Sequence, residues 1–265
     1  GSLGVTEKPT VTYSPLQGDR FIQRVLSPLP LDTITLLFNS GWNIERIFRL
    51  CFQRMNNLKN APGASGPTPS RSPYFIEFIS AVKYLRLLQI EDAINLSYQE
   101  ENGVPQLILN INDADKNRAE ARQFALAANV EPGKTRYVLA FSADSNKTNH
   151  IRVVTRSLLG IMFYISQAVE VPSKDISKGK VTQTQTRDGK IFDWDKVMGD
   201  LLKIRSASEK PQEYPMTIFY RGSWFYINDS DLSSKSTFSL LSQIFSLQAG
   251  KIKDNAPLLT LPIGQ

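Results

Sequence analysis

The spacing of apolar residues predicts helices over the first third of the chain. Residues 21–26 place their apolar side chains on one helical face, and Pro28 ends that helix because proline lacks a backbone N–H. A second, short helix is expected to begin at Leu31 and to be closed by Gly41. The clearest helix, with Asn43 as its N-cap, has apolar residues at i, i+3, i+4 and i+7 over about four turns: Ile44, Ile47, Phe48, Cys51, Phe52, Met55 and Leu58.

A long loop follows these helices at residues 61–70. Four prolines from Pro62 to Pro73 exclude a helix there. A loop of this length within a compact region is often functional or mobile. Apolar residues at helical spacing then predict a fourth helix over residues 73–89.

From residue 90 onward the pattern changes to alternating strands and short helices. Residues 94–99 and 104–111 are expected to be strands joined through Glu101-Asn102-Gly103, a sequence typical of tight hairpins. Residues 136–142 predict a strand, with residues 150–155 as its partner across a polar turn. The other expected elements are helices over 113–129, 157–167 and 233–248, strands over 201–205, 216–221 and 224–228, an exposed strand over 181–186, and an extended tail over 258–263.

This order of elements predicts an α+β fold. A helical N-terminal part is expected to pack on an antiparallel-rich α+β part, because helices followed by hairpins favour that class over a doubly wound sheet. We expect a linker over residues 1–14, a helical region over 15–90 and an α+β region over 91–265. The last two regions can also form one continuous domain.

Composition narrows the class of protein only slightly. The 265 residues are 41% hydrophobic and 21% charged, which is typical of a globular protein that needs no metal or disulfide for stability. A net charge of +6 allows a nucleic-acid or anionic-membrane partner without establishing one. Gly1-Ser2 is typical of a cloning remnant, so we expect the natural N-terminus to have been trimmed.

The familiar catalytic and cofactor motifs fail at identifiable positions. Gly133-Lys134-Thr135 is not a phosphate-binding loop, because Ala128 stands where the second glycine is needed. His150 is the only histidine, so the usual zinc sets and a Ser-His-Asp triad lack partners. Cys51 lies on an apolar stripe, where core packing explains it.

Two acidic segments resemble calcium loops but are incomplete. Residues 113–117 and 229–231 lack the closing glutamate of an EF-hand, and their aspartates suit helix starts instead. We therefore predict no catalytic, cofactor-binding or metal-ligating residue, and an enzyme is not favoured. A pair of carboxylates brought together only by the fold stays open.

Two surfaces are candidates for binding. A polar stripe opposite the apolar face of the third helix is either a solvated face or a grip for an anionic partner: Arg46, Arg49, Gln53 and Asn57. Residues 219–226 form the densest aromatic cluster, with Trp224 and Tyr226 expected on one face of a hairpin. These aromatic residues either pack in the core and at the sheet edge or form a surface that stacks on a base, a sugar or a peptide.

Several segments of the chain carry a family resemblance. The clearest are Thr155-Arg156-Ser157-Leu158-Leu159-Gly160 with 163–167, and Tyr220-Arg221-Gly222-Ser223-Trp224-Phe225-Tyr226-Ile227 with Asp229, Asp231 and 234–238; Ser14-Pro15-Leu16 and Ser40-Gly41-Trp42 add weaker matches. These segments, which span most of the chain, resemble an uncharacterised family of bacterial envelope-associated proteins. The resemblance implies an envelope protein, a lipoprotein anchored through a removed N-terminus being one form of it, and it supplies no activity, cofactor or catalytic residue.

Together these observations predict a non-enzymatic bacterial cell-envelope protein, periplasmic or membrane-anchored, that binds or scaffolds a protein partner without a cofactor. A small molecule or glycan is a further ligand class, and nucleic acid is not expected. The alternatives are a hydrolase whose active site is not visible in sequence and, less favoured, a nucleic-acid-binding protein; a cytoplasmic location stays open. The candidate binding surface consists of Tyr220, Arg221, Trp224, Tyr226 and Arg156.

Overall fold

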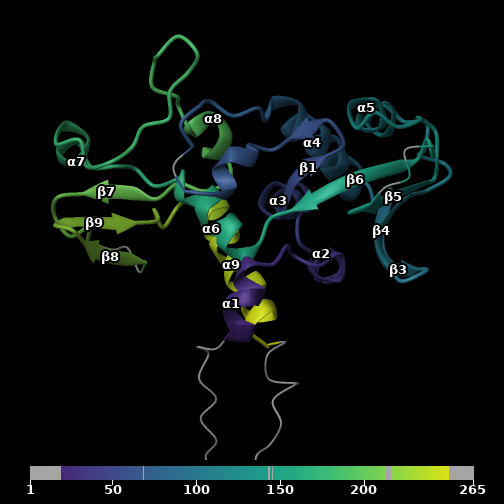
Figure 1. The fold of residues 1–265 in the computed structure, drawn as a ribbon, viewed down its shortest axis with the longest axis horizontal. Coiled ribbons are helices and arrows are strands. Elements are labelled where there is room, and N and C mark those ends of the chain that lie inside the picture. The colour runs from purple at the N-terminus through teal and green to yellow at the C-terminus, as the bar shows by residue number, and fades with distance from the viewer. Residues whose placement is uncertain (1–18, 68, 143, 145, 213–215, 251–265) are drawn as a thin grey trace, which may run out of the picture.

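The computed structural model describes residues 19–250 except 68, 143, 145 and 213–215. It confirms the α+β class, with a six-stranded mixed sheet and a three-stranded antiparallel sheet. Figure 1 shows the two sheets on opposite sides of a central group of helices that includes α1 (Asp19–Leu26), α6 (Leu158–Ser166) and α9 (Leu232–Gly250). The linker and tail expected at residues 1–14 and 258–263 lie outside the described residues.

The helices follow local sequence signals. The Asn43 side chain accepts hydrogen bonds from the backbone N–H groups of Glu45 and Arg46, and Ser157 caps α6 through the N–H of Gly160. The sequence predicts both caps, Asn43 and Ser157, and the structure confirms them. The remaining helices are α2 (Leu31–Asn39), α3 (Ile44–Cys51), α4 (Ile76–Ile90), α5 (Ala119–Ala127), α7 (Ser173–Ser177), α8 (Asp195–Met198) and the short 3₁₀ helix η1 (Pro62–Ser65).

The six-stranded sheet has the strand order β2-β1-β6-β5-β4-β3. The predicted hairpin between β3 and β4 is confirmed, because Asn102 and Gly103 both adopt the positive φ angles that a tight two-residue turn needs. The strands are β1 (Phe52–Met55), β2 (Leu58–Lys59), β3 (Ile94–Glu101), β4 (Val104–Ile111), β5 (Arg136–Ala140) and β6 (His150–Thr155).

Strands β5 and β6 pair, as the sequence predicts, but they run parallel. Val138 lies opposite His150 and Leu139 opposite Ile151. A polar turn between two successive strands favours an antiparallel hairpin. Strand β6 lies between β5 and β1 in the sheet and pairs antiparallel with β1.

One face of the large sheet forms the hydrophobic core. Leu96 lies opposite Leu109, which lies opposite Tyr137 on the next strand, and all three are buried in one hydrophobic cluster. On the other face, polar side chains such as Gln99 and Gln106 hydrogen-bond across the strands. Helix α2 packs against β3 and β4, and α4 against β2 and β3.

The third predicted helix is wrong beyond Cys51. The chain turns there into β1 and β2, and Met55 pairs with Val153 of β6. The region over 15–90 therefore contains strands as well as helices, and its residues share the hydrophobic cluster with residues of 91–265. An apolar stripe fits either element when its burial depends on a distant partner strand.

Two predicted strands also differ from the structure. Residues 181–186 form only isolated bridges at Gln185, and the strand expected over 201–205 is displaced to β7 (Arg205–Ala207). The strands β8 (Thr217–Tyr220) and β9 (Ser223–Tyr226) complete the small sheet, which has the order β7-β9-β8. Within the described part of the chain, no helix combines the length and the apolar character needed to cross a bilayer.

A buried arginine network holds the end of α3. Arg156, which is 1% exposed, donates from Nη1 to the carbonyls of Arg49 and Phe52 at 3.0 and 2.7 Å, and from Nη2 to the carbonyl of Asn60. Its guanidinium lies 3.8 Å from the ring centroid of Tyr164. The Asn60 side chain also donates to the Arg49 and Phe52 carbonyls. These donors satisfy carbonyls that the end of a helix leaves unpaired.

We expect Arg156→Met to lower the free energy of unfolding by about 3 kcal/mol, because the buried carbonyls of Leu50 and Asn60 lose their donor and those of Arg49 and Phe52 keep only the Asn60 amide. Arg156→Lys should be intermediate, since an ammonium cannot match the planar guanidinium. Arg152→Met, which changes an exposed arginine of β6 four positions earlier, is the control and should stay within about 0.5 kcal/mol of wild type. Denaturant unfolding followed by circular dichroism measures all three, and an Arg156→Met variant as stable as the control would refute the role of the network.

Candidate functional site

The predicted aromatic hairpin forms the free end of the small sheet. Arg221 and Gly222, with φ angles of 49° and 75°, make a two-residue turn between β8 and β9. Such a turn matches the right-handed twist of the two strands. Lys174 of α7 donates to the carbonyl of Gly222, so a hydrogen bond connects the turn to α7. The expectation of a tight hairpin at Arg221-Gly222-Ser223 is confirmed.

The strand register separates the two faces of this hairpin. Phe219 lies opposite Trp224, and Thr217 lies opposite Tyr226, so these four side chains share one face. The ring centroids of Phe219 and Trp224 are 5.1 Å apart, and the Lys210 ammonium lies 5.4 Å from the Trp224 centroid. We call Phe219, Trp224 and Tyr226 the aromatic face.

The opposite face of the hairpin is partly buried. Ile227 is buried, and Ile218 and Phe225 line an apolar cavity of about 290 Å³ together with Phe238 of α9. Phe238 of α9 lines this cavity together with residues of both faces of the hairpin, Tyr226 among them. Packing therefore accounts for part of the aromatic cluster, and a binding role for the rest stays a prediction.

The outer edge strand β8 exposes large apolar and aromatic side chains to solvent. Ile218, Phe219 and Tyr220 are 64%, 57% and 62% exposed, and no other described strand pairs with β8 on that side. Figure 1 shows β8 as the outermost strand of the small sheet. Natural edge strands are usually protected by charged residues, proline or a covering segment. The four residues of β8 include no charge and no proline.

Backbone groups also point outward along this edge. In a hairpin closed by a two-residue turn, the residues that flank the turn form a hydrogen-bonded pair, and the pairs then alternate. Tyr220 flanks the turn, so the N–H and C=O groups of Phe219 and Thr217 point away from β9. The edge therefore presents donors and acceptors next to large apolar side chains.

Arg156 does not belong to this surface, which corrects the sequence expectation. It is buried beside Asn60 and Tyr164, and no atom of the aromatic face contacts it among the interactions described above. Burial lowers the pKa of its guanidinium to about 10, which leaves it cationic at neutral pH. No sequence signal indicates this burial. Alternation along β6 buries Ile151 and Val153 and turns Arg152 outward, and the same alternation continued to Arg156 would turn that side chain outward too.

The polar stripe predicted on the third helix is only partly buried: Arg49 is buried, Arg46 and Gln53 are half-buried, and Asn57 is exposed, with Gln53 and Asn57 lying beyond the end of α3. Arg49 is 2% exposed and donates to Glu45 at 3.1 Å, to Asp200 at 2.7 Å and to the carbonyl of Val197. Arg46 donates to the carbonyl of Ser233 at 2.7 Å. These contacts hold the side chains of Arg46 and Arg49 against α8 and the start of α9. The Arg46–Arg49 face is therefore not an open basic surface, and the nucleic-acid alternative stays an untested prediction.

Of the groups that a hydrolase would use, His150 and Cys51 lie near opposite ends of β6. His150 lies at the start of β6, and burial lowers its pKa. Cys51 is fully buried, as core packing predicts, and burial raises the pKa of its thiol to about 12. Within the described ranges, no group of three His, Cys, Asp or Glu residues is arranged to hold a metal ion.

One pocket of about 540 Å³ does gather carboxylates, from Glu170, Asp193 and Asp195. Each of them already accepts a bond from the protein. Asp195 pairs with Lys203 at 2.5 Å, Asp193 accepts from the N–H of Asp195, and Glu170 accepts from the N–H of Ser206. Each of these carboxylates therefore has a described partner within the protein, and the hydrolase alternative stays a prediction.

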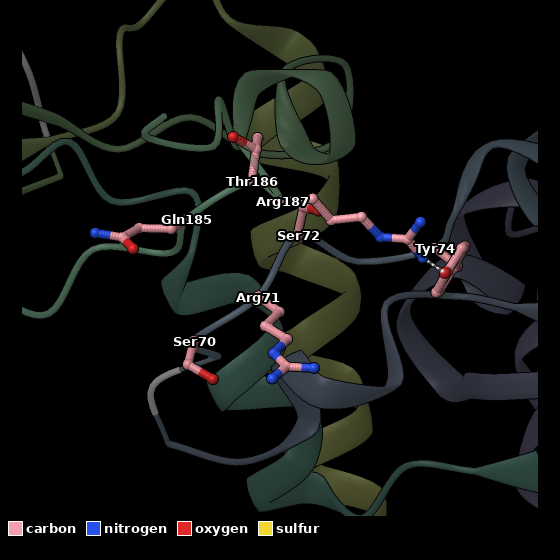
Figure 2. A pocket seen from close by; sticks show the side chains of 7 residues that line it. All are labelled: Ser70, Arg71, Ser72, Tyr74, Gln185, Thr186 and Arg187. Atoms are coloured by element: carbon pink, nitrogen blue, oxygen red, sulfur yellow. Dashed lines mark hydrogen bonds between the residues drawn. The ribbon is translucent and has the colours of Figure 1, made fainter. Parts of the chain in front are cut away.

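A second, polar pocket of about 480 Å³ was missed by the sequence reasoning. Four residues at and just after the end of the proline-rich loop, Ser70, Arg71, Ser72 and Tyr74, line it together with residues 185–187, which are more than 100 positions away in the sequence. Figure 2 shows these residues, with Arg187 reaching toward Tyr74. The one signal available in sequence was the length of the loop over 61–70, which is described here except for residue 68.

Comparison of the chain with protein-family models, with curated proteins and with solved structures gave no match.

We expect Asp200→Asn to lower stability by about 1 kcal/mol at pH 7, since Asp200 is more than half exposed and solvent weakens its pair with Arg49. Burial raises the pKa of Asp200, but the hydrogen bond from Arg49 and the charges of Arg49 and Lys83 outweigh it and leave the pKa below its usual value. A carboxyl with a lowered folded-state pKa stabilises the protein above the unfolded-state pKa and loses that effect as the pH falls.

The difference in unfolding free energy between wild type and Asp200→Asn should therefore shrink from pH 7 toward pH 3. Urea unfolding at several pH values measures it, with Glu91→Gln as an exposed control whose side chain makes no described contact. A difference that stays constant over this range would show that Asp200 does not act through its charge.

Proposed function

We propose that this protein is a non-enzymatic bacterial cell-envelope protein that binds an extended segment of a partner protein along the outer edge of β8. The observation that carries the proposal is the exposure of Ile218, Phe219 and Tyr220 on an unpaired strand edge. An exposed apolar edge of this kind recruits another strand. The envelope location rests on the resemblance of 155–167 and 220–238 to envelope-associated proteins.

The chemistry of the edge selects an extended peptide as the occupant. The outward N–H and C=O groups of Thr217 and Phe219 need partners, and a peptide strand supplies them at the matching spacing. Side chains of an added strand alternate between its two faces. One set would extend the aromatic face, and the other would lie toward the apolar cavity beside Ile218 and Phe225.

Charge at the hairpin favours an acidic partner segment. Arg221 is exposed at the turn, and Lys210 lies beside Trp224. A carboxylate near either end of the bound segment would pair with these cations, which raises the association rate and fixes the direction of binding more than it adds affinity. The partner is thus an extended segment with alternating apolar residues and at least one acidic residue.

The test selects peptides from a displayed library of random dodecapeptides against the immobilised chain. We expect enriched peptides to alternate apolar and polar residues, and to bind Thr217→Pro and Ile218→Lys about tenfold more weakly than wild type. Thr217→Pro removes one outward N–H at an edge position where proline is tolerated. Ile218→Lys places a charge on the edge strand. Fluorescence anisotropy of synthetic peptides measures the affinities.

Arg122→Gln, a change on an exposed face of α5, is the matched control and should bind the peptides as wild type does. Enriched peptides that bind both hairpin variants normally, or the absence of enrichment, would overturn the proposal. Sedimentation at increasing concentration covers the alternative occupant. A dimer abolished by Ile218→Lys would replace the partner protein with a second copy of the chain.

A further inference from the structure

The polar pocket between residues 70–74 and 185–187 has a well-supported framework. The Ser72 N–H donates to the carbonyl of Gln185 at 2.9 Å, and the Gln185 N–H donates to the carbonyl of Ser70 at 3.3 Å. Below them, the buried Thr184 hydroxyl donates to the carbonyl of Pro69 and accepts from the indole of Trp194. Two distant segments are thus fixed side by side, and the pocket exists before any ligand binds.

The lining of this pocket is cationic and uncompensated. Arg71 and Arg187 are its charged residues. Neither guanidinium lies within 4 Å of a described carboxylate, and the Arg71 side chain makes no described hydrogen bond. The neighbouring carboxylate of Asp188 is held by the Thr186 hydroxyl and by Lys190, and these two contacts lower its pKa. The acid closest to Arg187 in sequence is therefore engaged elsewhere.

The remaining lining groups suit a hydroxylated ligand. Arg187 donates to the Tyr74 hydroxyl at 2.6 Å, and the Lys59 ammonium lies 4.9 Å from the centroid of this ring, which is 57% exposed, so a stacking ligand would use the face opposite Lys59. The side-chain hydroxyls of Ser70 and Ser72 make no described hydrogen bond. In Figure 2 the Arg71 guanidinium lies apart from that of Arg187, and Gln185 points to the opposite side.

We infer that this pocket binds an anionic saccharide, whose acidic group pairs with Arg71 or Arg187 and whose ring stacks on Tyr74. A sugar ring presents C–H groups that pack on an aromatic face and hydroxyls that exchange hydrogen bonds with serines. A planar guanidinium binds a carboxylate or a phosphate through two parallel hydrogen bonds. This site is separate from the β8 edge and does not rest on the function proposed there.

The experiment is isothermal titration calorimetry of the full chain with four probes. Trigalacturonate carries carboxylates, its methyl ester is the neutral match, galactose 6-phosphate carries a phosphate, and inorganic phosphate lacks the sugar. We expect one or both charged saccharides to bind and the methyl ester to bind at least tenfold more weakly. Binding should weaken as salt rises, because the arginines are exposed. The preferred charged probe distinguishes a carboxylate source from a phosphate source.

Variants separate the contributions of charge and stacking. Arg71→Gln and Arg187→Gln should each weaken binding about tenfold, and Tyr74→Ala should weaken it about fivefold. Arg122→Gln removes the same charge far from the pocket and should leave binding unchanged, as should Ile218→Lys. Since all of these side chains are exposed, circular dichroism should show unaltered folding.

Three results would overturn the inference. The first is no heat of binding from either charged saccharide, and the second is wild-type affinity in the variant that carries both arginine changes. The third is inorganic phosphate binding as tightly as galactose 6-phosphate with no effect of Tyr74→Ala, which would mark a simple anion site and remove the saccharide. Loss of peptide binding at β8 with saccharide binding intact would instead contradict the proposed function alone.

Discussion

The fold depends on a buried cation that terminates a helix. The end of α3 leaves carbonyls without partners inside the core, where water cannot reach them. Arg156 supplies a planar set of donors to these carbonyls, assisted by the amide of Asn60, and Tyr164 covers its guanidinium. No carboxylate takes part among the contacts that Arg156 makes in the described structure, so the charge is balanced by the negative end of the helix dipole and by the carbonyls.

This network also positions the more distant surfaces. It fixes α3, whose Arg49 then reaches Asp200 and Val197 and holds the segment that leads into β7 and α9. It also fixes Asn60 and Ser65. Ala61, which follows Asn60, donates its N–H to the carbonyl of Tyr74. The polar pocket is therefore linked to the core through a short path of hydrogen bonds.

The two candidate surfaces differ in the physical basis of recognition. The β8 edge offers backbone hydrogen bonds and exposed apolar side chains, which suit an extended peptide. The pocket at Arg71 and Arg187 offers charge, hydroxyls and one aromatic ring in a preformed hollow, which suit a small polar ligand. A protein that carries both could hold a partner segment and an anionic saccharide at the same time, because the two surfaces share no lining residue.

The sequence by itself determined the features that depend on neighbouring residues: the α+β class, the turns at Asn102-Gly103 and Arg221-Gly222, and the helix cap at Asn43. Tertiary structure alone decided where α3 ends, since Phe52 becomes a strand residue only by pairing with β6. It also decided the burial of Arg156 and the pocket, which join residues about 100 positions apart. A local pattern records a side chain's polarity and period, but it does not record which distant carbonyls or charges will surround that side chain.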